Sequence, residues 1–82
     1  MIRHLKLYIR SGCSLCEEMQ WELTTLAARV GGFTVDAVDV DSEEGLKQTY
    51  GHKVPVLTSA DGDEICHYFL DRQALDSYFL TH

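Results

Sequence analysis

Apolar residues recur with the period of a strand in some stretches of the chain and with the period of a helix in others. Residues 5–9 alternate and predict a first strand. A helical stripe follows at spacings of three and four, formed by Leu15, Met19, Leu23, Leu26 and Val30. On this phase Trp21 falls on the opposite, polar face, so we expect its ring to be at least partly exposed. Gly31 and Gly32 are expected to end the helix.

The remaining pattern predicts three further strands and two further helices. We expect strands over residues 33–40, 52–58 and 65–69 and a short helix over residues 43–50. A last helix is expected to run from its cap at Asp71 to about residue 80. Asp41 or Ser42 is expected to cap the short helix, because Asp41 and Glu44 have the spacing of a capping box.

Two features predict how these strands pair. The Asp61-Gly62 dipeptide between the third and fourth strands is typical of a hairpin, so this pair is expected to be antiparallel. A helix separates the first two strands, which are therefore expected to be parallel with a right-handed crossover. The order β-α-β-α-β-β-α predicts an α/β fold in which helices cover a mixed four-stranded sheet, as a single domain over residues 1–82.

Composition and charge narrow the class of protein. Hydrophobic residues make up 45% and charged residues 24% of the 82 residues, as in ordinary soluble globular domains. The net charge of −6 disfavours a nucleic-acid or membrane partner, because such surfaces attract Lys and Arg. No apolar run approaches the length of a membrane span, and residues 1–5 lack the features of a signal peptide. Three cysteines are too few for a secreted disulfide framework, so we expect a cytoplasmic protein.

Cys13 and Cys16 stand at the junction between the first strand and the long helix, a setting that suits dithiol chemistry. Cys13 precedes the helix, where unpaired backbone N–H groups and the helix dipole stabilise a thiolate. Cys16 lies about one turn inside the helix, toward the buried stripe. Disulfide exchange proceeds by thiolate attack, so Cys13 is the candidate nucleophile and Cys16 the candidate resolving thiol. We expect Cys13 to be the more exposed and the more acidic of the two.

Charged residues near the pair act in both directions. Arg10 and Lys53 are candidates to lower the pKa of Cys13 further. Glu17 and Glu18 suit the dipole at the start of the helix, but their charge opposes formation of a thiolate. The size of the change in pKa therefore depends on where these side chains point.

A structural disulfide and half of a metal site are the alternatives for the cysteine pair. Zinc needs four protein ligands, or three and a water. The other possible ligands are His4, His52, Cys66, His67 and His82. None of these forms a second pair with ligand spacing, and Cys66 and His67 are neighbours that point to opposite faces of a strand. We therefore expect no metal and no cofactor, and we expect Cys66 to be a small core or edge residue.

Pro55 lies between Val54 and Val56 in a segment that otherwise predicts a strand. Proline removes a hydrogen-bond donor from a sheet and is normally excluded from central strands. Two interpretations remain open. In one, a cis peptide turns the Val54 backbone outward to receive an extended substrate. In the other, the segment is an edge strand with the more common trans proline.

Three segments, residues 7–18, 38–41 and 50–57, together resemble the small glutaredoxin-like proteins of the thioredoxin fold. The resemblance spans nearly the whole chain, and the three segments occur in the order and spacing of the family. It implies a thioredoxin-like fold with three helices and sheet order 2-1-3-4, in which the fourth strand is antiparallel to the third.

The resemblance also implies roles for individual residues. Cys13 would be the nucleophile and Cys16 the resolving thiol, with Pro55 in cis beside them. Arg10, three residues before the first cysteine, matches a basic residue that glutaredoxins often carry. The substrate-binding residues expected on this basis are Arg10, Lys53, Val54 and Pro55.

The chain departs from the family pattern at four points, one of which is that no aromatic residue precedes Cys13, where thioredoxins carry Trp. Its motif is Cys-Ser-Leu-Cys rather than the Cys-Pro-Tyr-Cys of dithiol glutaredoxins or the Cys-Gly-Pro-Cys of thioredoxins. Leu7 stands where thioredoxins place a buried Asp that assists proton transfer. Phe69 and Leu70 replace the two glycines that glutaredoxins carry before the last helix, and these bulky side chains are expected to narrow a glutathione groove.

These features predict a thiol–disulfide oxidoreductase that acts on protein disulfides rather than as a glutathione-dependent glutaredoxin. The expected partners are a disulfide-containing protein and a reductant, either a reductase of the thioredoxin reductase type or glutathione. We expect the protein to be a monomer. The alternative is a non-catalytic adaptor of the same fold, which docks a protein partner through Trp21 and an acidic surface.

Overall fold

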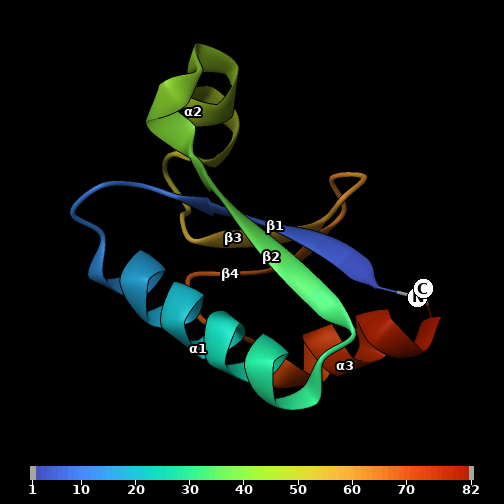
Figure 1. The fold of residues 1–82 in the computed structure, drawn as a ribbon. Helices are drawn as coiled ribbons and strands as arrows, with labels where there is room; N and C mark the ends of the chain where they lie inside the picture. The colour runs from blue at the N-terminus through green and yellow to red at the C-terminus, as the bar shows by residue number, and fades with distance from the viewer. Residues whose placement is uncertain (1, 82) are drawn as a thin grey trace.

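One sheet of four strands, in the order β2-β1-β3-β4, organises the computed structural model, which describes residues 2–81. The strands are β1 (Arg3–Ile9), β2 (Phe33–Asp39), β3 (Val56–Ser59) and β4 (Glu64–His67). β1 is parallel to β2 and antiparallel to β3, and β3 is antiparallel to β4. The α/β class and the strand order 2-1-3-4 expected from the sequence are confirmed (Figure 1).

Helices cover the two faces of the sheet unequally. They are α1 (Ser14–Val30), the 3₁₀ helix η1 (Val40–Ser42), α2 (Glu44–Tyr50) and α3 (Arg72–Thr81). α1 and α3 lie on one face of the sheet, and the short α2 lies on the other side near the end of β2 (Figure 1). Within residues 2–81, no helix is long and apolar enough to cross a membrane.

The alternation of side chains along the strands divides the core between these two faces. The larger cluster packs beneath α1 and α3 and contains Leu5, Leu7, Met19, Leu23, Phe33, Leu57, Cys66 and Leu75. The smaller cluster packs beneath α2 and contains Tyr8, Val40 and Val56. Cys66 is 8% exposed and is a core residue, one of the two places expected from the sequence. The ends of β1 and β3 that lead into the cysteine and proline segments are thus packed on both faces.

The buried side of α1 is only partly the one predicted. Its buried residues are Cys16, Met19 and Leu23. Trp21 is 69% exposed, which confirms its expected position on the polar face. Val30 is predicted to belong to the buried stripe but is 67% exposed. Val30 has the helical phase of the buried stripe, but it is the last residue of α1. The chain turns at Gly31 (φ 69°) directly after it, so Val30 lies beyond the part of the helix that is buried against the sheet.

The first two strands differ slightly from their predicted ranges. β1 begins at Arg3 rather than at residue 5, because β2 pairs with it along its whole length from Arg3 opposite Phe33. β2 ends at Asp39 rather than at residue 40, because Val40 is the first residue of η1 and packs under α2.

The last two strands also differ from prediction, and for backbone reasons. β3 begins at Val56 rather than at residue 52, because Pro55 has no N–H to donate to a strand ladder and residues 51–53 form a turn. β4 covers residues 64–67 rather than 65–69, because Tyr68 has a φ of 65°, which lies outside the strand region.

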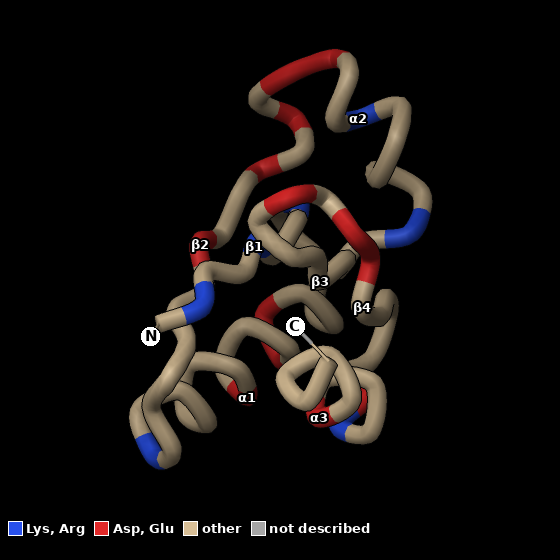
Figure 2. The backbone as a smooth tube through the Cα atoms, turned by 90° about the vertical axis from the view of Figure 1, so that its right-hand side faces the viewer, with Lys and Arg blue, Asp and Glu red and all other residues tan. Residues whose placement is uncertain are grey.

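The prediction that Asp41 or Ser42 caps α2 is wrong. The residue before α2 is Glu43, and in the described chain its side chain makes no capping hydrogen bond. Asp39 instead caps η1: its carboxylate accepts the N–H of Asp41 at 2.9 Å, and its backbone carbonyl accepts the Ser42 hydroxyl at 2.6 Å. Asp41 and Ser42, the caps that the sequence assigns to α2, therefore lie inside η1 instead. Figure 2 shows that acidic residues gather in this segment between β2 and α2.

Two other predicted local signals form as expected. The Asp71 carboxylate accepts the N–H of Ala74 at 3.0 Å and so caps α3. Gly62, with a φ of 98°, lies in the hairpin between β3 and β4, where a residue with a side chain would be strained.

Candidate active site

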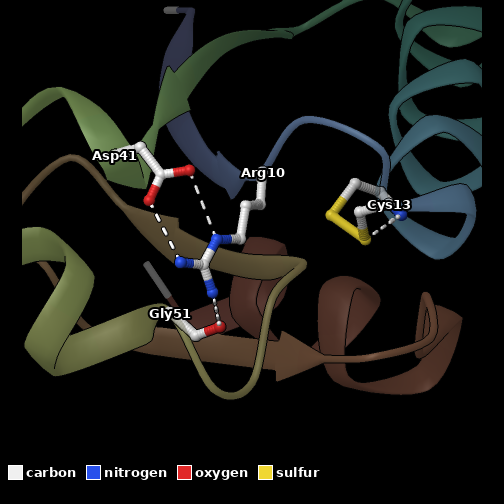
Figure 3. Close-up of a disulfide and its surroundings, with 5 residues drawn as sticks. Arg10, Cys13, Asp41 and Gly51 are labelled. Carbon is white, nitrogen blue, oxygen red and sulfur yellow. Dashed lines mark hydrogen bonds and ion pairs between the residues drawn. A yellow bond between two sulfur atoms is a disulfide. The ribbon is translucent and has the colours of Figure 1, made fainter.

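Cys13 and Cys16 form a disulfide at the N-terminus of α1 (Figure 3). Gly12, with a φ of 75°, lets the chain turn out of β1, and Cys13 follows in an extended conformation as the N-cap of α1. Cys16 lies one turn inside the helix and is only 2% exposed, whereas Cys13 is half-buried. Cys13 is therefore the more exposed residue of the pair, as predicted.

The start of α1 provides favourable electrostatics for the Cys13 sulfur. Its Sγ accepts a hydrogen bond from the N–H of Cys16 at 3.1 Å. This N–H is one of those in the first turn that have no carbonyl partner within the helix. When the disulfide is reduced, the same N–H and the positive end of the helix dipole stabilise a negative charge on Cys13. Glu17 and Glu18 are exposed in the same turn, where water screens their opposing charges.

The proline segment lies beside the strand that leads to the cysteines. The Val54–Pro55 peptide bond is cis. The antiparallel pairing of β1 with β3 places Val56 opposite Tyr8. The proline segment therefore joins β3 at the end where β1 leads into the turn that carries the cysteine pair.

Tyr68 holds the proline segment from the other side. Its N–H donates to the carbonyl of Pro55 at 2.9 Å, and its hydroxyl donates to the carbonyl of His52 at 3.3 Å. Within residues 2–81, no hydrogen bond involves the backbone N–H or carbonyl of Val54. The segment is therefore fixed in place while one residue keeps both backbone groups free for an extended ligand.

Arg10 connects three segments of the chain rather than facing the disulfide. Its Nε and Nη2 donate to the two carboxylate oxygens of Asp41 at 3.3 and 3.2 Å, and its Nη1 donates to the carbonyl of Gly51 at 3.3 Å. Figure 3 shows the guanidinium pointing away from Cys13. This bidentate geometry ties the end of β1 to η1 and to the turn before the proline segment. The positive charge expected beside the nucleophile is thus balanced by Asp41.

Lys53 is likewise paired with a carboxylate. Its Nζ donates to Oε1 of Glu64 at 2.6 Å, and Oε2 of Glu64 lies 2.8 Å from Nδ1 of His67. The hydrogen bond with Glu64 raises the pKa of Lys53, and the same bond holds the pKa of Glu64 below its ordinary value. Lys53 therefore links the proline segment to β4.

We expect Glu64→Gln to lower the melting temperature slightly at neutral pH and not at low pH. Because folding lowers the pKa of Glu64, its contribution to stability is present above the unfolded value of about 4.3 and is lost as the pH falls through the folded value. The effect should be a few degrees at most, since the pair is partly exposed. Thermal melts of both proteins between pH 3 and 7 measure it. Asp63→Asn is the control, and an equal pH dependence in both variants would contradict the assignment.

The glutaredoxin-like domain family (DUF836) matches residues 4–80 of the chain. The matched range contains most of β1, the cysteine pair, the proline segment and most of α3. The chain belongs to this glutaredoxin-like family. No curated protein matches it.

Solved structures place this glutaredoxin-like protein within the thioredoxin fold. Protein Ne2328 from Nitrosomonas europaea, solved by NMR in solution, is 37% identical with a TM-score of 0.81, over 95% of this chain and 92% of that chain. A protein from X. campestris, solved by X-ray methods, is 32% identical with a TM-score of 0.69, over 95% and 97%. A mutant thioredoxin from Halobacterium salinarum NRC-1 is 28% identical with a TM-score of 0.57, over 92% and 69%. A cysteine pair on this fold is compatible with a redox role.

The third cysteine of the glutaredoxin-like chain lies apart from this site. Cys66 is buried in β4, and burial raises the pKa of its thiol, which keeps it protonated and unreactive at neutral pH. Across residues 2–81, no group of three or more His, Cys, Asp or Glu side chains is arranged to hold a metal ion. His82, named above as a possible ligand, lies outside the described residues.

Several residues that shape this glutaredoxin-like site cannot be found by sequence reasoning alone. Asp41 has the spacing of a helix cap, and nothing local indicates that it pairs with Arg10, 31 positions away. Glu64 shows only as the start of a strand, although it holds Lys53. Tyr68 carries no signal for its positive φ, because aromatic residues rarely adopt that conformation.

Proposed function

We propose that this glutaredoxin-like protein is a thiol–disulfide oxidoreductase that uses the Cys13–Cys16 pair. The observation that supports it best is the position of the disulfide at the N-terminus of α1, with Cys13 half-buried and Cys16 buried behind it. A reachable sulfur next to unpaired N–H groups is the setting of a reactive thiolate. The buried second sulfur is protected from solvent and directly adjacent to the first.

In the proposed reaction the reduced protein transfers two electrons to a target disulfide. The Cys13 thiolate attacks one target sulfur, forms a mixed disulfide and releases the other target sulfur as a thiolate. The Cys16 thiolate then attacks Sγ of Cys13, closes the internal disulfide and releases the second target thiol. A thiol reductant, either a reductase of the thioredoxin reductase type or glutathione, regenerates the dithiol by the reverse sequence.

The free backbone groups of Val54 are proposed to bind the target. An extended peptide that pairs with this N–H and carbonyl adds a short strand beside the proline segment, close to Cys13. Arg10 and Lys53 are proposed to position the loops of the site rather than to bind the target directly. The charge of each is balanced by a carboxylate, Asp41 for Arg10 and Glu64 for Lys53.

Protein disulfides suit this site better than glutathione does. Glutathione is an anionic tripeptide, and the two cations nearest the site are already paired with Asp41 and Glu64. Phe69, whose side chain is 67% exposed, stands where glutaredoxins have a glycine. A protein segment bound mainly through backbone hydrogen bonds depends less on free cations. Glutathione is therefore proposed as a possible reductant rather than as the preferred substrate.

The test is the redox potential of the cysteine pair together with catalysed reduction of a protein disulfide. We expect a potential in the range of known exchangers, roughly −120 to −270 mV, and reduction of insulin well above the rate given by an equal concentration of free dithiol. Turnover equal to that of the free dithiol would contradict the proposal. That result would favour the alternative, a non-catalytic adaptor, for which the 69% exposure of Trp21 is the supporting observation.

A further inference from the structure

Two hollows lie between α1 and the segment that joins β4 to α3, and the first of them begins in the N-terminal turn of α1. The first is a hollow of about 90 Å³, bounded by Leu15, Glu18, Glu22, Phe69 and Leu70. The second is a hollow of about 240 Å³, bounded by Trp21, Glu22, Leu26, Arg29, Leu70 and Arg72. Glu22 and Leu70 border both hollows, so the two adjoin, and together they are here called the α1 groove. Leu15, at its near end, directly precedes Cys16 in the chain.

The dimensions of the α1 groove suit a short extended peptide. From Leu15 to Arg29 the helix rises by roughly 21 Å, at 1.5 Å per residue. An extended chain advances by about 3.3 Å per residue, so roughly six residues cover this length. A segment that enters beside Cys13 therefore has room to follow α1 for nearly its whole length.

The α1 groove has exposed aromatic rings on its borders. Trp21 is 69% exposed and Phe69 is 67% exposed, each next to a different hollow. Large exposed aromatic side chains of this kind are enriched at the energetic centres of protein interfaces. The half-buried Leu26 and Leu70 supply apolar surface between them.

Charge divides the α1 groove into two ends. Glu18 and Glu22 stand one turn apart near the disulfide, and Arg29 and Arg72 stand at the far end. None of these four side chains forms an ion pair within residues 2–81. By contrast, Arg10 is already paired with Asp41. The unpaired charges that a ligand meets are therefore acidic near the disulfide and basic away from it.

We infer that the α1 groove binds an extended segment of the protein whose disulfide is exchanged, an inference that rests on the proposed function. The segment carries a basic residue close to its reactive cysteine, which meets Glu18 and Glu22. It carries an acidic residue about four positions further along, because the helix rises by about 14 Å between the middle of the acidic pair and Arg29. Apolar residues between these two pack against Trp21 and Phe69. The charge order of the α1 groove thus selects the target and its direction.

The experiment compares two synthetic peptides, each joined through one cysteine to the same neutral chromogenic thiol. The first peptide has Arg beside the cysteine and Glu four positions later, and the second has these two residues exchanged. Attack by the Cys13 thiolate transfers the peptide to Cys13 and releases the chromogenic thiol, whose absorbance reports the rate. We expect the first peptide to react about five to ten times faster than the second, the size that two exposed ion pairs provide.

Charge reversal in the α1 groove is expected to reverse this preference. The variant Glu18→Lys/Glu22→Lys should favour the second peptide. The variant Asp36→Lys/Asp61→Lys makes the same change in net charge outside the α1 groove and should keep the original preference. The ratio of the two rates within each protein is the readout, so a general change in thiol reactivity cancels.

The possible failures are distinguishable. Equal rates for the two peptides, both well above those of a free dithiol, would overturn the groove inference and leave the proposed function standing. If neither peptide reacts faster with the protein than with a free dithiol, the proposed function fails. Whether the α1 groove binds the peptides is then decided by a binding measurement alone. For that measurement the Cys13→Ser/Cys16→Ser variant is titrated with peptides that carry Ser in place of Cys. A blue shift of the fluorescence of Trp21, the single tryptophan, at lower concentration of the first peptide would support the groove. No shift with either peptide, or self-association of the chain through Trp21, would overturn it.

Discussion

Cys13→Ser is expected to abolish disulfide exchange, with a rate constant at least about a thousandfold lower, because a serine hydroxyl is not ionised at neutral pH. Cys16→Ser is expected to keep the first step, since the half-buried Cys13 remains at the start of α1. That variant cannot release the target, so a mixed disulfide should accumulate on Cys13. Mass spectrometry of the two reduced variants after incubation with a protein disulfide measures both effects. Cys66→Ala, which removes the buried third thiol, is the control and should exchange normally.

The same variants test the order of the two cysteines. The 2% exposure of Cys16 leaves almost none of its sulfur open to a large partner. Alkylation against pH should therefore show faster modification of Cys13 in Cys16→Ser than of Cys16 in Cys13→Ser. Faster neutral-pH modification of Cys16 would reverse the assigned roles. Retention of fold in both variants, checked by circular dichroism, excludes unfolding as the cause of lost exchange.

The parts of the fold that the sequence predicts are those with local causes. Gly31 ends α1 because a positive φ is needed there, and Asp71 caps α3 through its own side chain. Gly62 closes the hairpin for a similar reason. The directions of two strand pairs follow from these local elements, because a helix between two strands requires a parallel crossover and a tight turn requires an antiparallel pair. The strand order 2-1-3-4 is instead implied by the family resemblance.

The parts that the sequence does not predict depend on contacts between distant segments. Asp41 has the spacing of a cap, yet its carboxylate binds Arg10, which leaves α2 without that cap. Val30 has the right helical phase for burial, but it is the last residue of α1 and is 67% exposed. In both cases the local pattern is read correctly and tertiary structure overrides it.

The candidate site divides in the same way. Cys13, Cys16 and Pro55 are visible in the sequence because their chemistry requires those residue types at those positions. The balancing of Arg10 by Asp41 and of Lys53 by Glu64 is visible only in the structure. The consequence for the proposed function is chemical: a thiolate at Cys13 would be stabilised by the backbone N–H groups and dipole of α1, whereas the two cations link the neighbouring loops.

Leu75→Ala is expected to lower the free energy of unfolding by about 3 kcal/mol, the most severe loss of stability among the changes considered. Leu75 is the only residue of α3 in the fully buried class among those described, and its side chain is 0% exposed. Truncating it leaves a cavity where α3 meets the sheet. In a domain of 82 residues this is a large share of the total stability and corresponds to a fall in melting temperature of roughly 10–20 °C.

Leu80→Ala changes the same residue type in the same helix at a position 87% exposed, and it should change the unfolding free energy by less than about 0.5 kcal/mol. Urea unfolding of both variants with the disulfide intact measures the difference, and equal losses would show that α3 is not held to the sheet through Leu75.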